Sequence, residues 1–215
     1  MSQICAIIPM ANSEILPTEL LDLLDRNAIE TLVVTGPDYP GAYLKAQKQS
    51  RSVQMNFAAS KAKAEYLWFI HADSKLDQFC IDTLKQSIQN HPHDLLYFDL
   101  KFYEAHPLMM INEIGVKVRS DIFKMPFGDQ AFCLPRSLFF DVGTYPEELP
   151  YGEDHVLTWL IRLQGKKCIS VGASILTSPR KYLKKGWLNT TLTHLSLTYS
   201  QAFPFCKQLW KKRYS

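Results

Sequence analysis

The sequence lacks the short motifs that mark several common enzyme classes. It has no GxGxxG or Walker pattern, which argues against a Rossmann dinucleotide site and against a P-loop. It has no GxSxG element, so an α/β-hydrolase is disfavoured. No pair of histidines has the spacing of a zinc protease. The five cysteines are scattered without a CxxC pair, which argues against both a disulfide framework and a zinc site.

The chain also has little net charge and no long apolar run. A net charge of +3 over 215 residues is too small to indicate a nucleic-acid-binding protein by itself. No basic region precedes the short apolar run at the N-terminus, so we expect no signal peptide. A composition of 47% hydrophobic and 21% charged residues is typical of a globular protein. Because the cysteines are scattered, we expect them to be reduced and mostly buried thiols, as in a cytoplasmic protein.

Alternating strand and helix patterns predict an α/β fold. Short apolar runs predict strands at residues 5–8, 29–34, 66–70 and 95–102, with Pro9 ending the first. Helical patterns lie between them, at residues 17–27, 50–64 and 77–90. The order β-α-β-α-β-α-β predicts a doubly wound, mostly parallel sheet flanked by helices. Beyond it we expect helices at residues 107–124 and 153–163 and short strands at residues 130–134, 168–171 and 175–176.

The central element is the run YLWFIHAD, residues 66–73. Its apolar part predicts a fully buried strand, and ligands of open α/β sheets bind outside the carboxyl ends of the strands. His71 and Asp73 would lie there. A carboxylate in this place can hold a hard divalent cation, which in turn can hold a diphosphate. Asp73, followed by Ser74, is equally typical of a residue that opens the turn into the next helix.

Two further acidic sites contain candidate catalytic residues. Asp129 stands in the sequence FGDQ at the entrance to a short predicted strand. Glu153 and Asp154 open a predicted helix directly after Gly152. Acids in the first turn of a helix are ordinary partners of the helix dipole, so this pattern alone leaves capping and catalysis both open.

Six short motifs, taken in order, give nearly the whole chain a resemblance to a known family. They are SRSVQMN (50–56), FIHAD (69–73), PFGDQ (126–130), ED (153–154), TSPRKY (177–182) and GWLNTT (186–191). They resemble the GRARQMN, FLHADT, PYGDQ, MED, TSARRW and GVLRTT motifs of one bacterial subgroup of family 2 glycosyltransferases, which have the GT-A fold. The HAD segment is similar to the DxD-type motif of that family.

The resemblance implies an inverting glycosyltransferase that moves a sugar from a nucleotide diphosphate-sugar to an unknown acceptor hydroxyl. It implies that Asp73 binds Mg²⁺ or Mn²⁺ and that Asp154 takes the proton of the acceptor hydroxyl. In this arrangement Glu153 orients Asp154. It also assigns substrate binding to a wider set of residues: Pro9, Asn12, Glu14, Arg51, Gln54, Asn56, His71, Asp129, Gln130, Arg180 and Lys181. The implied organisation is a GT-A-like catalytic domain at residues 1–180 with a C-terminal helical extension, residues 181–215, packed on it.

The sequence departs from the family pattern near the expected nucleotide. Thr35 stands where most members have an aspartate that contacts the base or ribose, and the usual PxxNE has one residue inserted after Pro9. These departures keep a second hypothesis open, a non-catalytic nucleotide- or sugar-binding module on the same fold. A nucleotidyltransferase is a weaker third hypothesis, because residues 10–16 are neither glycine-rich nor basic. Arg51 can also be interpreted as an exposed arginine that only contributes to solubility.

The C-terminal extension has the pattern of an amphipathic helix. Residues 186–206 carry no formal charge but are too polar for a membrane span. The apolar face consists of Leu188, Leu192, Leu195 and Tyr199, and we expect it to pack on the protein. Two tryptophans and the basic run at residues 211–213 also fit a peripheral contact with the inner face of a membrane.

Overall fold

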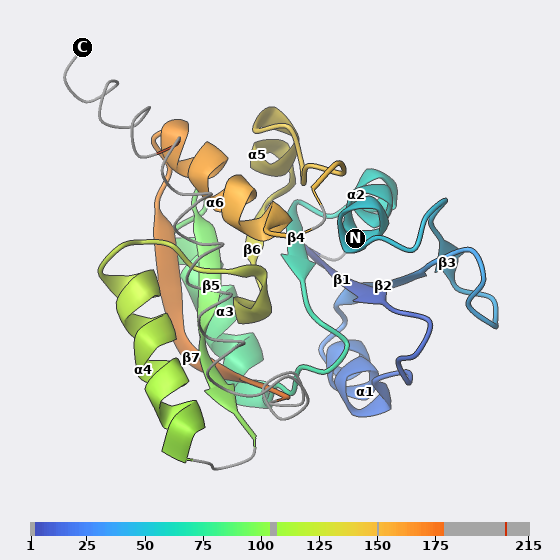
Figure 1. Ribbon diagram of the computed structural model, residues 1–215, viewed down its shortest axis with the longest axis horizontal. Helices are drawn as coiled ribbons and strands as arrows, with labels where there is room; N and C mark the ends of the chain where they lie inside the picture. Colours follow the sequence, from blue (N-terminus) through green and yellow to red (C-terminus); the bar gives the residue numbers. More distant parts are fainter. Residues whose placement is uncertain (1–2, 104–106, 150, 179–204, 206–215) are drawn as a thin grey trace.

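The computed structural model describes residues 3–103, 107–149, 151–178 and 205 (Figure 1). The strands are β1 (Ile4–Met10), β2 (Glu30–Thr35), β3 (Leu44–Lys45), β4 (Tyr66–Phe69), β5 (Leu95–Phe102), β6 (Cys133–Pro135) and β7 (Cys168–Thr177). The helices are α1 (Thr18–Arg26), α2 (Arg51–Lys61), α3 (Gln78–Asn90), α4 (Pro107–Asp121), α5 (Arg136–Asp141) and α6 (Glu153–Leu163). A 3-10 turn covers Gly128–Gln130.

The strands form one sheet in the order β3-β2-β1-β4-β6-β5-β7. Strands β1 to β4 are parallel to one another, and β5 is parallel to β7. β6 lies antiparallel between β4 and β5, so in the described part of the chain it is the one strand that runs against the others. The sheet is therefore mixed and mostly parallel, as the sequence predicted.

Helices cover both faces of the sheet because its central strands are apolar on both sides. In β1, Ile4, Ala6 and Ile8 belong to the core under α1 and α3. Cys5 and Ile7 of the same strand belong to the core under α2, α5 and α6. Successive side chains of a strand point to opposite faces, so one continuous apolar strand contributes to both cores.

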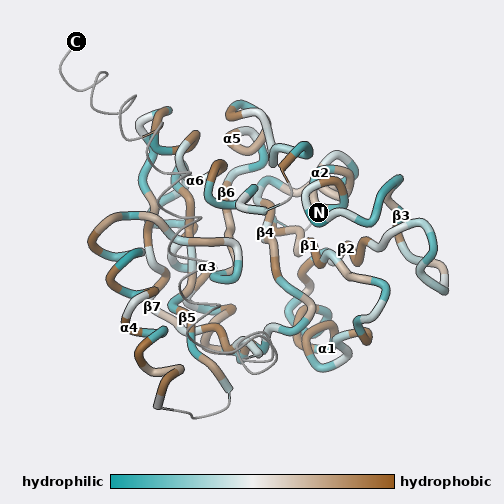
Figure 2. The backbone as a smooth tube through the Cα atoms, viewed as in Figure 1, coloured by the Kyte–Doolittle hydropathy of each residue, from teal (hydrophilic) through white to brown (hydrophobic). Residues whose placement is uncertain are grey.

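α4 lies beside β5 and presents apolar side chains to solvent. Ile111 and Ile114 of the helix, and Ile122 just after it, are more than half exposed. Hydrophobic residues, drawn in brown, recur along α4 in Figure 2. Across the residues that the structure describes, no helix combines the length and the apolar character needed to cross a membrane.

β1 runs through Pro9 to Met10, whereas the sequence predicted that Pro9 ends it. Pro9 pairs with Val34 of β2 in the parallel register. On the other side of β1, Ile70 donates its N–H to the carbonyl of Ile7 at 3.0 Å, just past the end of β4. Residues two apart on a strand face the same neighbour, so the missing N–H of Pro9 lies beyond β4 and no ladder bond is lost.

Two other predicted boundaries were wrong. The strands expected at residues 168–171 and 175–176 form the single strand β7, whose register against β5 is irregular. Gly172 lies at this irregularity with φ of 79°, a left-handed conformation that glycine adopts without steric cost. Gln130 was expected to open a strand, but it ends the 3-10 turn ahead of β6.

Of the predicted extension at residues 181–215, the structure describes Phe205. Its ring stacks on Trp159 of α6, with ring centroids 5.9 Å apart and ring planes 7° apart. Arg180 and Lys181, both predicted to bind substrate, lie outside the described residues.

Candidate active site

Two helix N-termini meet outside the carboxyl end of β4. Arg51 is the first residue of α2, and Glu153 is the first residue of α6. Nε of Arg51 lies 2.6 Å from Oε1 of Glu153, a short charge-assisted hydrogen bond. The side chain of Glu153 is 6% exposed and that of Arg51 is 43% exposed. Arg51 is therefore fixed at the strand end, where it supplies the charge that a buried carboxylate needs.

The same guanidinium reaches the residue that follows the central strand. Nη1 of Arg51 lies 3.3 Å from Nε2 of His71. Burial of the imidazole and the positive charge of Arg51 lower the pKa of His71 to about 3, against the opposing effect of Asp154. His71 is thus neutral at physiological pH, and its Nε2 is free to accept the hydrogen bond from Arg51.

Asp154 is half-buried, and both oxygens of its carboxylate accept backbone hydrogen bonds. Oδ2 accepts from the amide of Gly128 at 2.6 Å, and Oδ1 accepts from the amide of His155 at 2.8 Å. Burial by itself raises the pKa of Asp154, but Arg51 and the two amides outweigh it and hold that pKa below its ordinary value. Asp154 is therefore an ionised and partly accessible carboxylate beside the buried Glu153.

The close contact between Gly128 and Asp154 favours glycine. A Cβ added at Gly128 would lie 3.1 Å from both Cβ and Oδ2 of Asp154, which is tighter than most packing contacts, so Asp154 would have to shift by a few tenths of an ångström. Sequence reasoning named the neighbouring Asp129, which is half-buried in the same turn, and missed the Gly128 amide. The glycine inside the FGDQ segment was the only signal of a close approach of the backbone.

Two of the side-chain amides predicted to bind substrate donate to main-chain carbonyls. Nε2 of the buried Gln54 donates to the carbonyl of Met10 at the end of β1, at 2.9 Å. Nε2 of Gln130 donates to the carbonyl of Phe98 in β5, also at 2.9 Å. Gln54 thus ties α2 to the end of β1, and Gln130 ties the turn ahead of β6 to the middle of β5.

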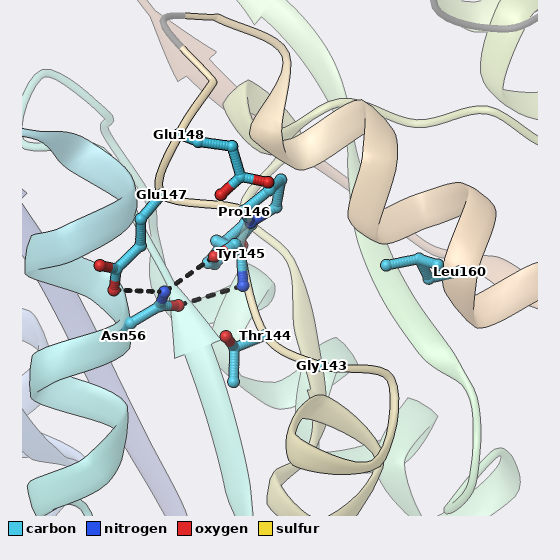
Figure 3. A pocket seen from close by; sticks show the side chains of 8 residues that line it. All are labelled: Asn56, Gly143, Thr144, Tyr145, Pro146, Glu147, Glu148 and Leu160. Carbon is cyan, nitrogen blue, oxygen red and sulfur yellow. Dashed lines mark hydrogen bonds between the residues drawn. The ribbon is translucent and has the colours of Figure 1, made fainter.

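Asn56 braces the loop that leads to α6 (Figure 3). Its Nδ2 donates to the carbonyl of Tyr145 at 2.8 Å and to Oε1 of Glu147 at 2.9 Å, while the amide of Tyr145 donates to its Oδ1 at 3.1 Å. A hollow of about 380 Å³ is lined by Asn56, Gly143, Thr144, Tyr145, Pro146, Glu147, Glu148 and Leu160. The side-chain amide of Asn56 is engaged in these bonds, which hold the loop that leads to Glu153 in place.

The loop after β1 is held by one of its own side chains and by one from the loop after β2. Oε2 of Glu14 accepts from the amide of Ala11 at 2.7 Å, and the hydroxyl of Tyr39 donates to the carbonyl of Glu14 at 3.0 Å. Asn12 is exposed at the tip of this turn. Pro9, by contrast, is buried within β1.

Asp73 and Ser74 line a cavity of about 280 Å³ between the end of β4 and the start of α1. Ser74 is 4% exposed, and its Oγ has no hydrogen-bond partner among the described residues. Those residues contain no cluster of three or more His, Cys, Asp or Glu side chains that could hold a metal. One carboxylate suffices, however, for a hard cation whose other ligands are diphosphate oxygens and water. The oxygen donors present therefore fit Mg²⁺ or Mn²⁺ held jointly with a diphosphate.

Solved structures share this fold, although no protein-family model and no curated protein matches the chain. S. aureus TarS matches with a TM-score of 0.62 and 19% identity, over 86% of this chain and 38% of that chain. TarS 1–349 in complex with UDP-GlcNAc matches with a TM-score of 0.61 and 20% identity, over 83% and 58%. Mannosyltransferase PcManGT from Pyrobaculum calidifontis, in complex with GDP-Man and Mn²⁺, matches with a TM-score of 0.65 and 17% identity, over 94% and 64%.

The likeness concerns the fold and not the whole of those proteins. The chain spans less than two thirds of the length of each of these solved structures. This likeness and the mixed sheet flanked by helices confirm the predicted GT-A-type α/β fold.

Proposed function

We propose that the chain is an inverting, metal-assisted glycosyltransferase of the family 2 type, with a nucleotide diphosphate-sugar as donor. The observation that carries the proposal is the convergence of Arg51, Glu153 and Asp154 outside the carboxyl end of β4. Ligands of open α/β sheets bind at this edge. Structures that share the fold hold UDP-GlcNAc in one case and GDP-Man with Mn²⁺ in another, which supports a donor of this chemical class.

Asp154 acts as the general base. Its carboxylate is ionised and partly exposed, whereas Glu153 is buried and paired with Arg51. The acceptor oxygen attacks the anomeric carbon from the face opposite the diphosphate, and Asp154 takes its proton. The bond from the anomeric carbon to the diphosphate oxygen breaks, the nucleoside diphosphate leaves and the configuration inverts.

Arg51 couples donor binding to the strength of this base. In the free chain its charge helps to hold the pKa of Asp154 low, which makes Asp154 a weak proton acceptor. A diphosphate near Arg51 brings negative charge that offsets the guanidinium, so the pKa of Asp154 rises towards the working pH. The base therefore strengthens when the donor is in place.

Asp73, with the Ser74 hydroxyl beside it, is the residue that would hold Mg²⁺ or Mn²⁺. When bound, such a cation neutralises charge that develops on the departing diphosphate. His71 is neutral and hydrogen-bonded to Arg51, so it fixes the segment that joins the end of β4 to Asp73. The catalytic domain then covers residues 1–180, and residues 181–215 pack on it, an arrangement that the stacking of Phe205 on Trp159 supports.

A non-catalytic binding module on the same fold is the second candidate, and Thr35 favours it. Thr35 is fully buried at the end of β2, and its Oγ1 has no hydrogen-bond partner among the described residues. A buried hydroxyl contacts a nucleotide less readily than an exposed aspartate would. The donor contact that the resemblance predicts at this position is therefore the weakest part of the proposed site.

Release of nucleoside diphosphate separates the two candidates. UDP-, GDP- and dTDP-sugars are first screened by thermal shift with and without Mn²⁺, because a ligand that binds only the native state raises its stability. The donor that binds is then incubated with the chain in the absence of acceptor. Slow, Mn²⁺-dependent release of the nucleoside diphosphate supports the transferase, and binding without any release supports the module.

A further inference from the structure

Arg119, on the inner side of α4, contacts the segment of residues 125–130 at three places. Its Nε donates to the carbonyl of Met125 at 3.0 Å, and its Nη2 donates to Oε1 of Gln130 at 3.1 Å. Between these two bonds its guanidinium carbon lies 3.5 Å from the ring centroid of Phe127, a cation–π contact. One side chain thus contacts the start, the middle and the end of the segment that contains Gly128.

Gln130 anchors this contact to the sheet. Its Oε1 also accepts from the hydroxyl of Ser120 at 2.8 Å and from the amide of Phe127 at 3.1 Å. Its Nε2 donates to Phe98 of β5, and the side chain is 1% exposed. Because Gln130 retains three of its four bonds without Arg119, removing the guanidinium loosens the segment locally and leaves its attachment to β5 intact.

The opposite side of the segment rests on α6. The ring of Phe127 lies 5.2 Å from that of His155, measured between centroids. Nε2 of His155 accepts from the indole N–H of Trp159 at 2.9 Å, and the hydroxyl of Thr158 donates to the carbonyl of Pro126 at 3.2 Å. The segment is therefore clamped between Arg119 of α4 and the first turns of α6.

We propose that Arg119 is a positioning residue, which holds the backbone amide of Gly128 against Oδ2 of Asp154. The inference rests on the proposed function, in which Asp154 is the general base. Arg119 contacts Met125, Phe127 and Gln130, and it acts on Gly128 through this segment. The amide that it places at 2.6 Å keeps the carboxylate oriented, so loss of Arg119 impairs the proton-transfer step and spares donor binding.

Hydrogen exchange of the Gly128 amide tests the proposal without any assay of activity. In Arg119→Ala we expect exchange at Gly128 to accelerate about tenfold or more, the equivalent of losing one ordinary hydrogen-bond contribution. The matched control is Arg136→Ala on α5, which removes a guanidinium stacked 4.8 Å from the ring centroid of Phe140, outside the segment. Exchange at a core amide such as Ile7 reports any general loss of stability in either variant.

Turnover provides the second measurement. Arg119→Ala should lower kcat about tenfold with KM for the donor nearly unchanged, and Arg119→Lys should recover part of the loss because it keeps a cation over Phe127. Unchanged exchange at Gly128, or equal acceleration at Gly128 and Ile7, overturns the positioning role whatever the turnover shows. If the wild-type chain has no transferase activity, the proposed function fails, and the exchange data still decide whether Arg119 positions the amide.

Discussion

Arg51 and Glu153 stand 102 positions apart in the sequence, and the structure places Nε of one 2.6 Å from Oε1 of the other. Each is the first residue of its helix, so the pair joins the N-terminus of α2 to that of α6. The same contact brings Asp154 beside the end of the central strand. The pair is therefore the structural link between two motifs that the sequence presents separately.

Loss of Arg51 should reduce both stability and ligand affinity. Arg51→Met leaves the buried Glu153 carboxylate without its cation, and we expect the free energy of unfolding to fall by about 1 to 3 kcal/mol. The double variant Arg51→Met, Glu153→Leu should recover part of that loss, because no unpaired charge remains buried. Denaturant titration of both variants measures the coupling between the two residues. In both variants the affinity for the donor should be lower than in the wild type. An affinity equal to that of the wild type in either variant would show that Arg51 has no role in binding.

Local patterns in the sequence predicted most of the fold. In α3 the buried face consists of Cys80, Ile81, Leu84 and Ile88, apolar residues that recur at helical spacing in the sequence, and Asp77 caps the helix by accepting from the amide of Cys80 at 2.9 Å. Periodicity was misleading where burial comes from both sides. In α6, Val156, Leu157 and Leu160 recur at helical spacing, yet Val156 is half-exposed, whereas Trp159 and Ile161 are buried.

The site was predictable only in part, because its key contacts join segments that are distant in the sequence. The motifs named Arg51, Asp154 and Gln130, but no local pattern could show that the amide of Gly128 would reach Asp154. Gln130 was expected to bind substrate, and in the structure its side-chain amide donates to the carbonyl of Phe98 in β5. A hydrogen-bonding side chain in a motif can serve the ligand or the architecture, and the three-dimensional contacts are needed to tell which.

His71 should make the folded chain sensitive to mild acid. Its pKa is 6.5 in an ordinary environment and about 3 in the folded chain. Between those values the unfolded chain binds a proton that the folded chain does not, so the free energy of unfolding decreases as the pH falls. The slope from this residue is at most about 1.4 kcal/mol per pH unit. Urea titrations near pH 7, 6 and 5 should give a shallower pH dependence for His71→Gln than for the wild type, and parallel curves would contradict the assignment.

Asp73→Asn should abolish Mn²⁺-dependent binding of the nucleotide while the fold remains intact. The carboxylate lines the cavity at the end of β4, and a neutral amide is a poor ligand for a hard cation. Asp82→Asn, an exposed change on α3, is the matched control. The measurement is the shift in Tm produced by UDP and GDP with and without Mn²⁺. A wild-type Mn²⁺ effect in Asp73→Asn would assign the cation to other residues.

Asp154→Asn should cut turnover by about a hundredfold or more, the usual contribution of a positioned base. Affinity for the sugar nucleotide should change little, because Arg51 and Asp73 remain. The substitution also has a structural cost. The amides of Gly128 and His155 donate to different oxygens of Asp154, and an asparagine has one oxygen to offer. Turnover must therefore be normalised to folded protein.

Glu153→Gln provides the contrast that decides between catalysis and helix capping. The glutamine keeps an oxygen to accept from Nε of Arg51 but loses the charge, so we expect a loss of stability and a smaller loss of turnover than in Asp154→Asn. Both acids lie in the first turn of α6, where either can stabilise the helix dipole. If their role were capping alone, the two variants would lose similar, modest stability and keep their turnover per folded molecule. A large loss confined to Asp154→Asn identifies that carboxylate as the base, since the partly accessible residue of the pair is the one that an acceptor hydroxyl can reach.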